Sequence, residues 1–437
     1  MNPFIKEQLQ GKKVLLAAIP SEGHFNPLTS LAKYLQEAGC DVRWYTSEIF
    51  AQKLQKLAIP HFPFVHAMDV NSQNLDQLFP ERLLINDPLA RVNFDIINGL
   101  GKRCNEFYAD IQEIQKSFPF ELFICDSMFP ATPLIKYKMN IPVVAIGVLP
   151  LAEESVDVPP YGMALLPAVN EEEMVQHAEL RGLVNEVFFK ESIAYYDAVM
   201  QENGLSIAKS MLTNLLIKEA DLYLQIGTPG FEYFRSDLGA NVHFIGALFP
   251  YVAQKERVLW FDERLKQYQK VLLVTQGTVE KDVKKIIEPT LEAFKDTDVL
   301  VIATTGGSGT AALKEKYAGE NFIIEDFIPF EDIMPYANAL ITNGGYGGTL
   351  LGIKHKLPVI AAGVHEGKNE ICARIGYFNC GINLHTETPS AGEIKNAAEE
   401  IIANDLYKNN VLKLSEEINS YDSTALIAQH ITELLAR

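Results

Sequence analysis

The sequence predicts an α/β protein with two Rossmann-like, parallel-sheet domains that face a central cleft. Two observations carry this prediction. Continuous apolar runs recur along the chain, and such runs are typical of strands that are buried on both faces of a parallel sheet. A turn and a helix-compatible segment follow most of these runs, so the order strand, helix, strand is found in both halves of the 437 residues.

Composition limits the class of partner. The net charge is -18, which disfavours general binding to nucleic acid or to anionic membranes. No apolar run approaches the roughly 18 residues of a membrane helix, so we expect no stable membrane insertion. The five cysteines are scattered and form no CxxC pair, as is typical of a reducing compartment. We expect a cytoplasmic monomer or homodimer.

The first strand is expected over 13–19, and the first helix after it. Asn26 is a good N-cap and Pro27 a good first helical residue, and Gly39 ends the helix. His24 then lies in the turn at the carboxyl end of the strand, where open α/β sheets bind their ligands. The alternative is a histidine that only caps a loop.

A second polar residue is expected at the same edge of the sheet. The run 121–126 is a buried strand that ends in Asp126. A carboxylate in this position is able to orient an imidazole and stabilise its protonated form, as in a His–Asp pair. The alternative is an aspartate that caps the next helix.

The chain then continues through a strand at 141–149, a proline-rich loop at 158–167 and one or two amphipathic helices between 171 and 211. Further strands are expected at 42–46, 220–226, 242–245, 270–278, 299–307, 321–327, 339–342 and 358–363. We divide the chain into a first Rossmann-like domain (1–245), a linker (246–260), a second Rossmann-like domain (261–421) and a final helix that crosses back to the first domain (422–437).

Glycines dominate the segment LITNGGYGGTLLG at 340–352, where a strand ends and a helix-compatible run from Thr349 follows. Glycine lets the backbone approach a ligand closely, and a helix that starts there directs free N–H groups at an anion. The segment therefore predicts a phosphate site. The alternative is a tight turn without a ligand.

Several motifs are absent. The sequence has no GxGxxG fingerprint followed by an acidic residue, no Walker A motif, no HExxH and no GxSxG. A dinucleotide dehydrogenase is therefore disfavoured. No DxD motif stands at the end of a strand, so a metal-held diphosphate is not indicated.

GHFNP at 23–27 and TNGGYGG at 342–348, within two Rossmann-like halves, resemble the UDP-glycosyltransferase family. These are inverting enzymes of GT-B fold, and the resemblance is to the bacterial branch that glycosylates macrolides and other natural products. It covers residues from about 12 to 430.

The resemblance implies that the domain at 1–245 binds the acceptor and the domain at 261–421 binds the nucleotide sugar. It implies His24 as catalytic base and Asp126 as its partner. It places the donor nucleotide sugar on Gly277, Thr278, Phe327, Pro329, Phe330, Asn343, Gly345, Gly347, Gly348, Thr349, Glu366 and Lys368. The chain also departs from the family pattern. Asn343 replaces a histidine beside the diphosphate, Phe327 replaces the tryptophan that stacks on the base, and Phe330 replaces a glutamine.

Two further departures affect the sugar. Leu351 stands where plant relatives hold the ribose with a glutamate, and Gly367-Lys368 replaces the Asp-Gln pair that reads the sugar hydroxyls. Glu366 or Lys368 is expected to take over that contact. A dTDP-sugar, which lacks the ribose 2′-hydroxyl, is therefore the second expectation for the donor after a UDP-sugar.

The expected reaction moves a sugar, with glucose as first choice, to a hydroxyl of a hydrophobic small molecule such as a flavonoid, another phenol or a macrolide. Phe94, Phe129 and Met163 are the expected acceptor contacts. Neither a metal nor a cofactor other than the sugar nucleotide is expected. The alternatives are a nucleotide-sugar 2-epimerase of the same fold and a binding protein that performs no chemistry.

Overall fold

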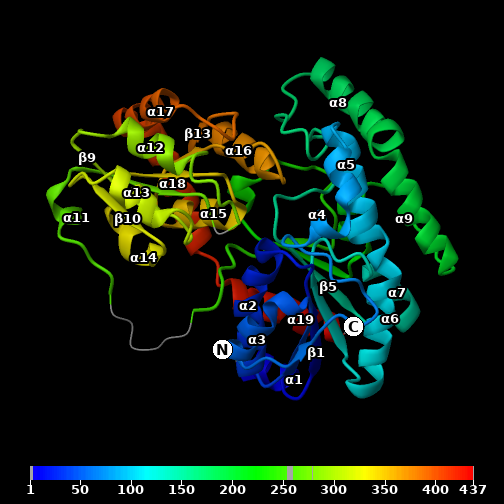
Figure 1. The fold of residues 1–437 in the computed structure, drawn as a ribbon. Helices are drawn as coiled ribbons and strands as arrows, with labels where there is room; N and C mark the ends of the chain where they lie inside the picture. The colour runs from blue at the N-terminus through cyan, green and yellow to red at the C-terminus, as the bar shows by residue number, and fades with distance from the viewer. Residues whose placement is uncertain (1–2, 253–258, 278, 437) are drawn as a thin grey trace.

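The computed structural model describes residues 3–252, 259–277 and 279–436. Its strands form two parallel sheets, one in each half of the chain (Figure 1). Two predictions touch residues outside this description, namely Thr278 and, within the predicted linker, positions 253–258.

The first sheet has the order β3-β2-β1-β4-β5-β6-β7, and all neighbouring strands are parallel. Every residue of β4 and β5 is buried, which explains why these strands are continuous apolar runs. The strands are β1 (Lys13–Ala17), β2 (Asp41–Tyr45), β3 (His61–Phe62), β4 (Leu122–Asp126), β5 (Val143–Gly147), β6 (Leu222–Gln225) and β7 (Val242–Phe244).

The second sheet has the order β10-β9-β8-β11-β12-β13 and is also parallel throughout. The direction in which successive strands are added reverses between β1 and β4 in the first sheet and between β8 and β11 in the second. Open α/β sheets bind their ligands at such switch points. The strands are β8 (Lys270–Thr275), β9 (Val299–Thr304), β10 (Phe322–Glu325), β11 (Ala339–Thr342), β12 (Val359–Ala361) and β13 (Gly381–Asn383).

Helices surround both sheets (Figure 1). In the first half they are α1 (Pro3–Leu9), α2 (Glu22–Glu37), α3 (Ala51–Leu57), α4 (Leu75–Leu78), α5 (Pro88–Asp95), α6 (Arg103–Ser117), α7 (Thr132–Met139), α8 (Glu171–Leu183), α9 (Lys190–Glu202) and α10 (Leu212–Glu219). The remaining helices are α11 (Arg264–Gln267), α12 (Ile287–Ala293), α13 (Thr310–Lys316), α14 (Phe330–Ile333), α15 (Tyr346–Lys354), α16 (Lys368–Tyr377), α17 (Ala391–Ala403), α18 (Asp405–Asn419) and α19 (Ser423–Leu435).

The predicted start of α2 is wrong. The helix begins at Glu22 with Ser21 as its N-cap, and Pro27 lies inside it. Phe25 is fully buried and stacks on Phe50, with ring centroids 4.1 Å apart. This packing outweighs the preference of proline for the first helical position. His24 is consequently a first-turn helical residue and does not lie in a turn before the helix.

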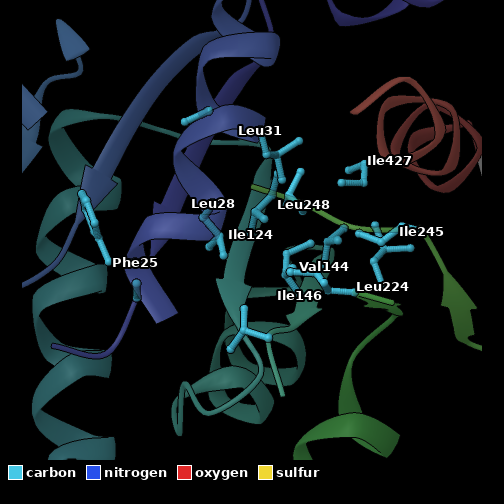
Figure 2. Close-up of a cluster of buried hydrophobic side chains, with 14 of the residues drawn as sticks. Phe25, Leu28, Leu31, Ile124, Val144, Ile146, Leu224, Ile245, Leu248 and Ile427 are labelled. Atoms are coloured by element: carbon cyan, nitrogen blue, oxygen red, sulfur yellow. The ribbon is translucent and has the colours of Figure 1, made fainter. Parts of the chain in front are cut away.

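The C-terminal helix α19 packs on the first half, against α1, α2 and β6. Its Ile427 joins a core that also contains Leu31 of α2 and Leu224 of β6 (Figure 2). Each of these side chains is fully buried, and burying a side chain of this size stabilises a fold by about 1.5–3 kcal/mol. The last helix therefore ties the end of the chain to its beginning.

A buried ion network joins the two halves. Arg374 of α16 has 1% of its side chain exposed and lies between two carboxylates. Its Nη2 is 2.6 Å from Glu232, which follows β6, and its Nη1 is 2.9 Å from Glu370 of its own helix. The guanidinium also lies over the ring of Tyr233, 4.2 Å from the centroid. Glu232 additionally accepts the N–H of Leu151.

Removing one partner of such a network leaves a buried charge without compensation. Burial alone raises the pKa of Glu232, but the charges and hydrogen bonds of Arg374 and Arg235 hold that pKa below its usual value. A depressed folded-state pKa gives stability that is present above the unfolded value of about 4.3. That stability is lost as the pH falls through the folded-state pKa.

We predict that Glu232→Gln lowers the free energy of unfolding at pH 7 by about 3 kcal/mol. The variant should also lose less stability than the wild type between pH 5 and pH 3, because the titrating carboxylate is gone. Urea unfolding at several pH values measures both effects. Glu113→Gln is the control, since Glu113 pairs with Lys116 on the surface and such pairs contribute little. Equal effects of the two substitutions would contradict the role of the network.

Candidate active site

A histidine–aspartate pair lies at the carboxyl edge of the first sheet. His24 Nδ1 is 2.7 Å from Asp126 Oδ1. The Asp126 side chain is fully buried and also accepts the N–H groups of Ile19 and Met128, each at 2.8 Å. Three donors therefore fix the carboxylate. His24 keeps 12% of its side chain exposed, and among the described residues its Nε2 has no hydrogen-bond partner.

The glycine segment forms a helix N-terminus at the edge of the second sheet. Gly344 has φ +77°, and Gly345 is the N-cap of α15. The first backbone bond of the helix runs from the N–H of Thr349 to the Gly345 carbonyl. The preceding N–H groups of the first turn thus have no acceptor within the helix. A Cβ atom at Gly347 or Gly348 would meet nothing within 4 Å, so open space lies beside this turn.

This helix starts earlier than predicted. The sequence placed the helical run from Thr349, but α15 begins at Tyr346, so Gly347 and Gly348 are helical residues. Thr349 is fully buried, and its hydroxyl has no hydrogen-bond partner among the residues described. An unpartnered buried hydroxyl is consistent with the predicted position of Thr349 beside the phosphate-binding turn.

Asn343 connects two strand ends. Its Nδ2 donates to the carbonyl of Gln276, after β8, at 2.7 Å. Gln276 in turn accepts the N–H groups of Ile286 and Ile287. Asn343 therefore helps to hold the turns after β8 and β11 together. Gly277, in the same β8 turn, has φ +73° and open space around it.

The expected base-stacking residues follow β10. Phe327 is 68% exposed, so its ring is free to receive a planar ligand. Pro329 is exposed as well, whereas Phe330 is half-buried and packs on the core of the second half. The two aromatic rings therefore differ in exposure, and only that of Phe327 is largely open to solvent.

The predicted sugar-reading residues form an ion pair. Lys368 Nζ is 2.7 Å from Glu366 Oε2, with Glu366 71% exposed. The neighbouring glycine turns touch, because a Cβ at Gly363 would lie 2.3 Å from the Asn343 carbonyl oxygen. The donor residues predicted at 343–349 and 366–368 are therefore brought to one edge of the second sheet.

The three predicted acceptor residues lie in different environments. Met163 is exposed in the loop before α8, and half-buried Phe94 packs edge-on against Phe79. Phe129 is fully buried and stacks on Phe107, with centroids 5.1 Å apart. Phe129 is thus a core residue, and contact with an acceptor would require this core to open.

Tyr346 is a contact that sequence reasoning missed. It belongs to α15, but its hydroxyl donates to the carbonyl of Ile226, the residue after β6, at 2.8 Å. The next residue, Gly227, has φ +109°, and a Cβ there would lie 2.5 Å from that hydroxyl. A glycine directly after a predicted strand was the only signal of this close approach.

Within 3–252, 259–277 and 279–436, no group of three or more His, Cys, Asp or Glu side chains is placed to hold a metal ion. Over the same residues no helix is long and apolar enough to cross a membrane.

Known proteins are similar to this chain over nearly its whole length. Residues 289–434 match the family described as "Erythromycin biosynthesis protein CIII-like, C-terminal domain". The 4'-demethylrebeccamycin synthase of Lentzea aerocolonigenes is 28% identical over 94% of this chain and 97% of its own. UDP-glycosyltransferase 2 of Phaeomoniella chlamydospora is also 28% identical, over 97% and 96% of the two chains.

Solved structures show the same fold. The glycotransferase of kitacinnamycin has a TM-score of 0.74 at 15% identity and covers 97% of this chain and 99% of its own. The Streptomyces sp. SF2575 glycosyltransferase SsfS6, complexed with thymidine diphosphate, has a TM-score of 0.65 at 16% identity, with coverages of 97% and 99%.

Two parallel-sheet domains of this topology form the GT-B fold, which the solved glycosyltransferase structures share. The chain is similar over nearly its whole length to proteins named as UDP-glycosyltransferases, and these relatives support a glycosyltransferase.

The geometry predicts which nitrogen of neutral His24 carries the proton. Because Nδ1 faces the Asp126 carboxylate at 2.7 Å, we expect Nδ1–H, with the lone pair on Nε2. Nitrogen-15 NMR of the imidazole measures this directly, and the His24→Gln variant assigns the signal. A signal for the Nε2–H tautomer would contradict the predicted orientation.

Proposed function

We propose that this chain transfers a sugar, with glucose as first choice, from a UDP-sugar to a hydroxyl of a hydrophobic small molecule, with inversion at the anomeric carbon. The observation that carries the proposal is the His24–Asp126 pair. Its carboxylate is buried and fixed by three donors, while the imidazole remains partly exposed. This is the arrangement of a general base held by a carboxylate.

The donor is proposed to lie on the second half. Its diphosphate would accept hydrogen bonds from the free N–H groups at the start of α15, where the helix dipole favours negative charge. The open space beside Gly347 and Gly348 supports this placement. Backbone groups in this position stabilise the leaving diphosphate without a metal ion.

The nucleobase is proposed to stack on Phe327, whose ring is largely exposed. UDP is the first choice for the nucleotide, because relatives carry that nucleotide in their names. TDP is the second choice, since a structural neighbour holds thymidine diphosphate. Leu351 offers no hydrogen bond to a ribose hydroxyl, and this supports keeping TDP.

In the proposed reaction His24 Nε2 takes the proton of the acceptor hydroxyl. The acceptor oxygen forms a bond to the anomeric carbon from the face opposite the diphosphate. The bond between that carbon and the diphosphate oxygen breaks, and the diphosphate leaves with the electron pair. Asp126 stabilises the imidazolium that forms. The acceptor is a phenol or macrolide held by the first half.

We predict that His24→Gln lowers kcat for transfer to a phenolic hydroxyl by about 10²–10⁴-fold. Binding of nucleoside diphosphate should be unchanged, because His24 belongs to the other half. The measurement is glycoside formation by mass spectrometry, with free UDP or TDP counted in parallel. His430→Gln, on α19, is the matched control and should keep full activity.

Unchanged turnover in the His24→Gln variant would exclude the base assignment. Release of nucleoside diphosphate without any acceptor, together with an epimerised sugar, would favour the epimerase alternative.

We also predict that Phe327→Ala weakens nucleotide binding by about tenfold, because stacking on an aromatic ring contributes roughly 1–3 kcal/mol per base. Its effect on stability should stay within about 0.5 kcal/mol, since the side chain is exposed. Calorimetric titration with UDP and TDP measures the affinity. Phe234→Ala is the control, because Phe234 is 77% exposed in the first half. Equal nucleotide affinity in both variants would remove Phe327 from the site.

A further inference from the structure

The loop before α8 is docked on the start of α16 by three hydrogen bonds between the two halves. The N–H groups of Gly162 and Ala164 both donate to Glu370 Oε1 at 2.8 Å. Asn369 Nδ2 donates to the carbonyl of Gly162 at 2.7 Å. A loop of the proposed acceptor half is therefore fixed beside the segment proposed to read the donor sugar.

A second set of contacts fixes the position of Glu370 itself. Glu370 is 3% exposed, and its second oxygen accepts from Arg374 Nη1 at 2.9 Å. Arg374 is bound in turn by Glu232 of the first half. Because each carboxylate oxygen of Glu370 has its own partner, the loop residues from Tyr161 to Ala164 have little freedom to shift.

The side chain of Tyr161, in this loop, ends in a hydroxyl whose environment is unusual. Its hydroxyl oxygen is buried and has no hydrogen-bond partner within the described parts of the chain. Burial raises the pKa of Tyr161, so the hydroxyl is neutral and able both to donate and to accept. A buried hydroxyl without a partner costs free energy, which indicates that a ligand or water completes it.

The hydroxyl of Tyr161 faces Gly367. A Cβ atom built on Gly367 would lie 3.7 Å from the Tyr161 oxygen. Gly367 is the N-cap of α16, between the Glu366 and Lys368 side chains. The space that a side chain at position 367 would enter is thus next to the unpartnered hydroxyl.

We propose that the Tyr161 hydroxyl binds a hydroxyl group of the donor sugar and so determines which sugar is accepted, in place of the side chain that Gly367 lacks. This inference rests on the proposed donor site at Glu366–Lys368. The contact comes from the acceptor half, so the sugar is recognised only when both halves are together.

Tyr161→Phe tests the proposal because it removes one oxygen atom and keeps the ring. The affinity for UDP and for TDP should stay within about twofold of the wild type, whereas kcat/KM for UDP-glucose or TDP-glucose falls about 3- to 10-fold, the value of one neutral hydrogen bond. With one of the singly deoxygenated glucose donors, wild type and variant should be equal. The thermal midpoint should be unchanged or higher, because an unsatisfied buried group is removed.

Tyr34→Phe is the matched control. Tyr34 also has a buried hydroxyl without a partner among the described residues, but it lies on α2. This variant should keep wild-type kcat/KM for every donor.

The outcomes distinguish failure of the proposed donor site from failure of the Tyr161 contact. A wild-type protein that binds neither UDP nor TDP overturns both the proposed donor site and this inference. If the wild type binds a nucleotide and Tyr161→Phe uses every sugar donor as well as the wild type, this inference alone is overturned.

Discussion

The relative position of the two sheets depends on one buried guanidinium, that of Arg374. Arg374 pairs with Glu232 of the first half through Nη2, at 2.6 Å, and with Glu370 of the second half through Nη1, at 2.9 Å. A charge this deeply buried is tolerated only when it is paired and hydrogen-bonded. The two halves therefore gain from staying together in one relative position. That position brings the loop at 161–164 onto α16.

The chain combines a strongly acidic surface with a proposed site for an anion. At a net charge of -18, long-range attraction does not bring a diphosphate to the protein. In the proposed site, backbone N–H groups at the start of α15 would attract the diphosphate at short range, because they carry fixed partial positive charge and need no basic side chain. Glycine at 347 and 348 keeps that surface uncovered. The same physics explains why the segment was recognisable in the sequence.

Much of the fold was predictable because buried parallel strands must be apolar throughout. The strand at 339–342 was placed at its observed bounds, whereas β3 and β13 were missed because they are two and three residues long and partly exposed. The start of α2 was wrong because aromatic packing of Phe25 decided it. The pairing of Glu232 with Arg374, 142 positions apart, is a tertiary contact that no local pattern reveals. In the candidate site, too, local patterns were predictable and most tertiary contacts were not. His24 and Asp126 meet at the sheet edge where both were expected. No sequence pattern, however, indicated that the hydroxyl of Tyr161 lacks a partner among the described residues.

The most direct test of donor binding at α15 is a crystal structure of the chain with bound UDP or TDP. We expect the diphosphate oxygens within hydrogen-bonding distance of the N–H groups of Gly347 and Gly348, with the base on Phe327 and the sugar end directed toward His24. A nucleotide bound elsewhere, or a diphosphate held through a metal ion by acidic side chains, would contradict this arrangement.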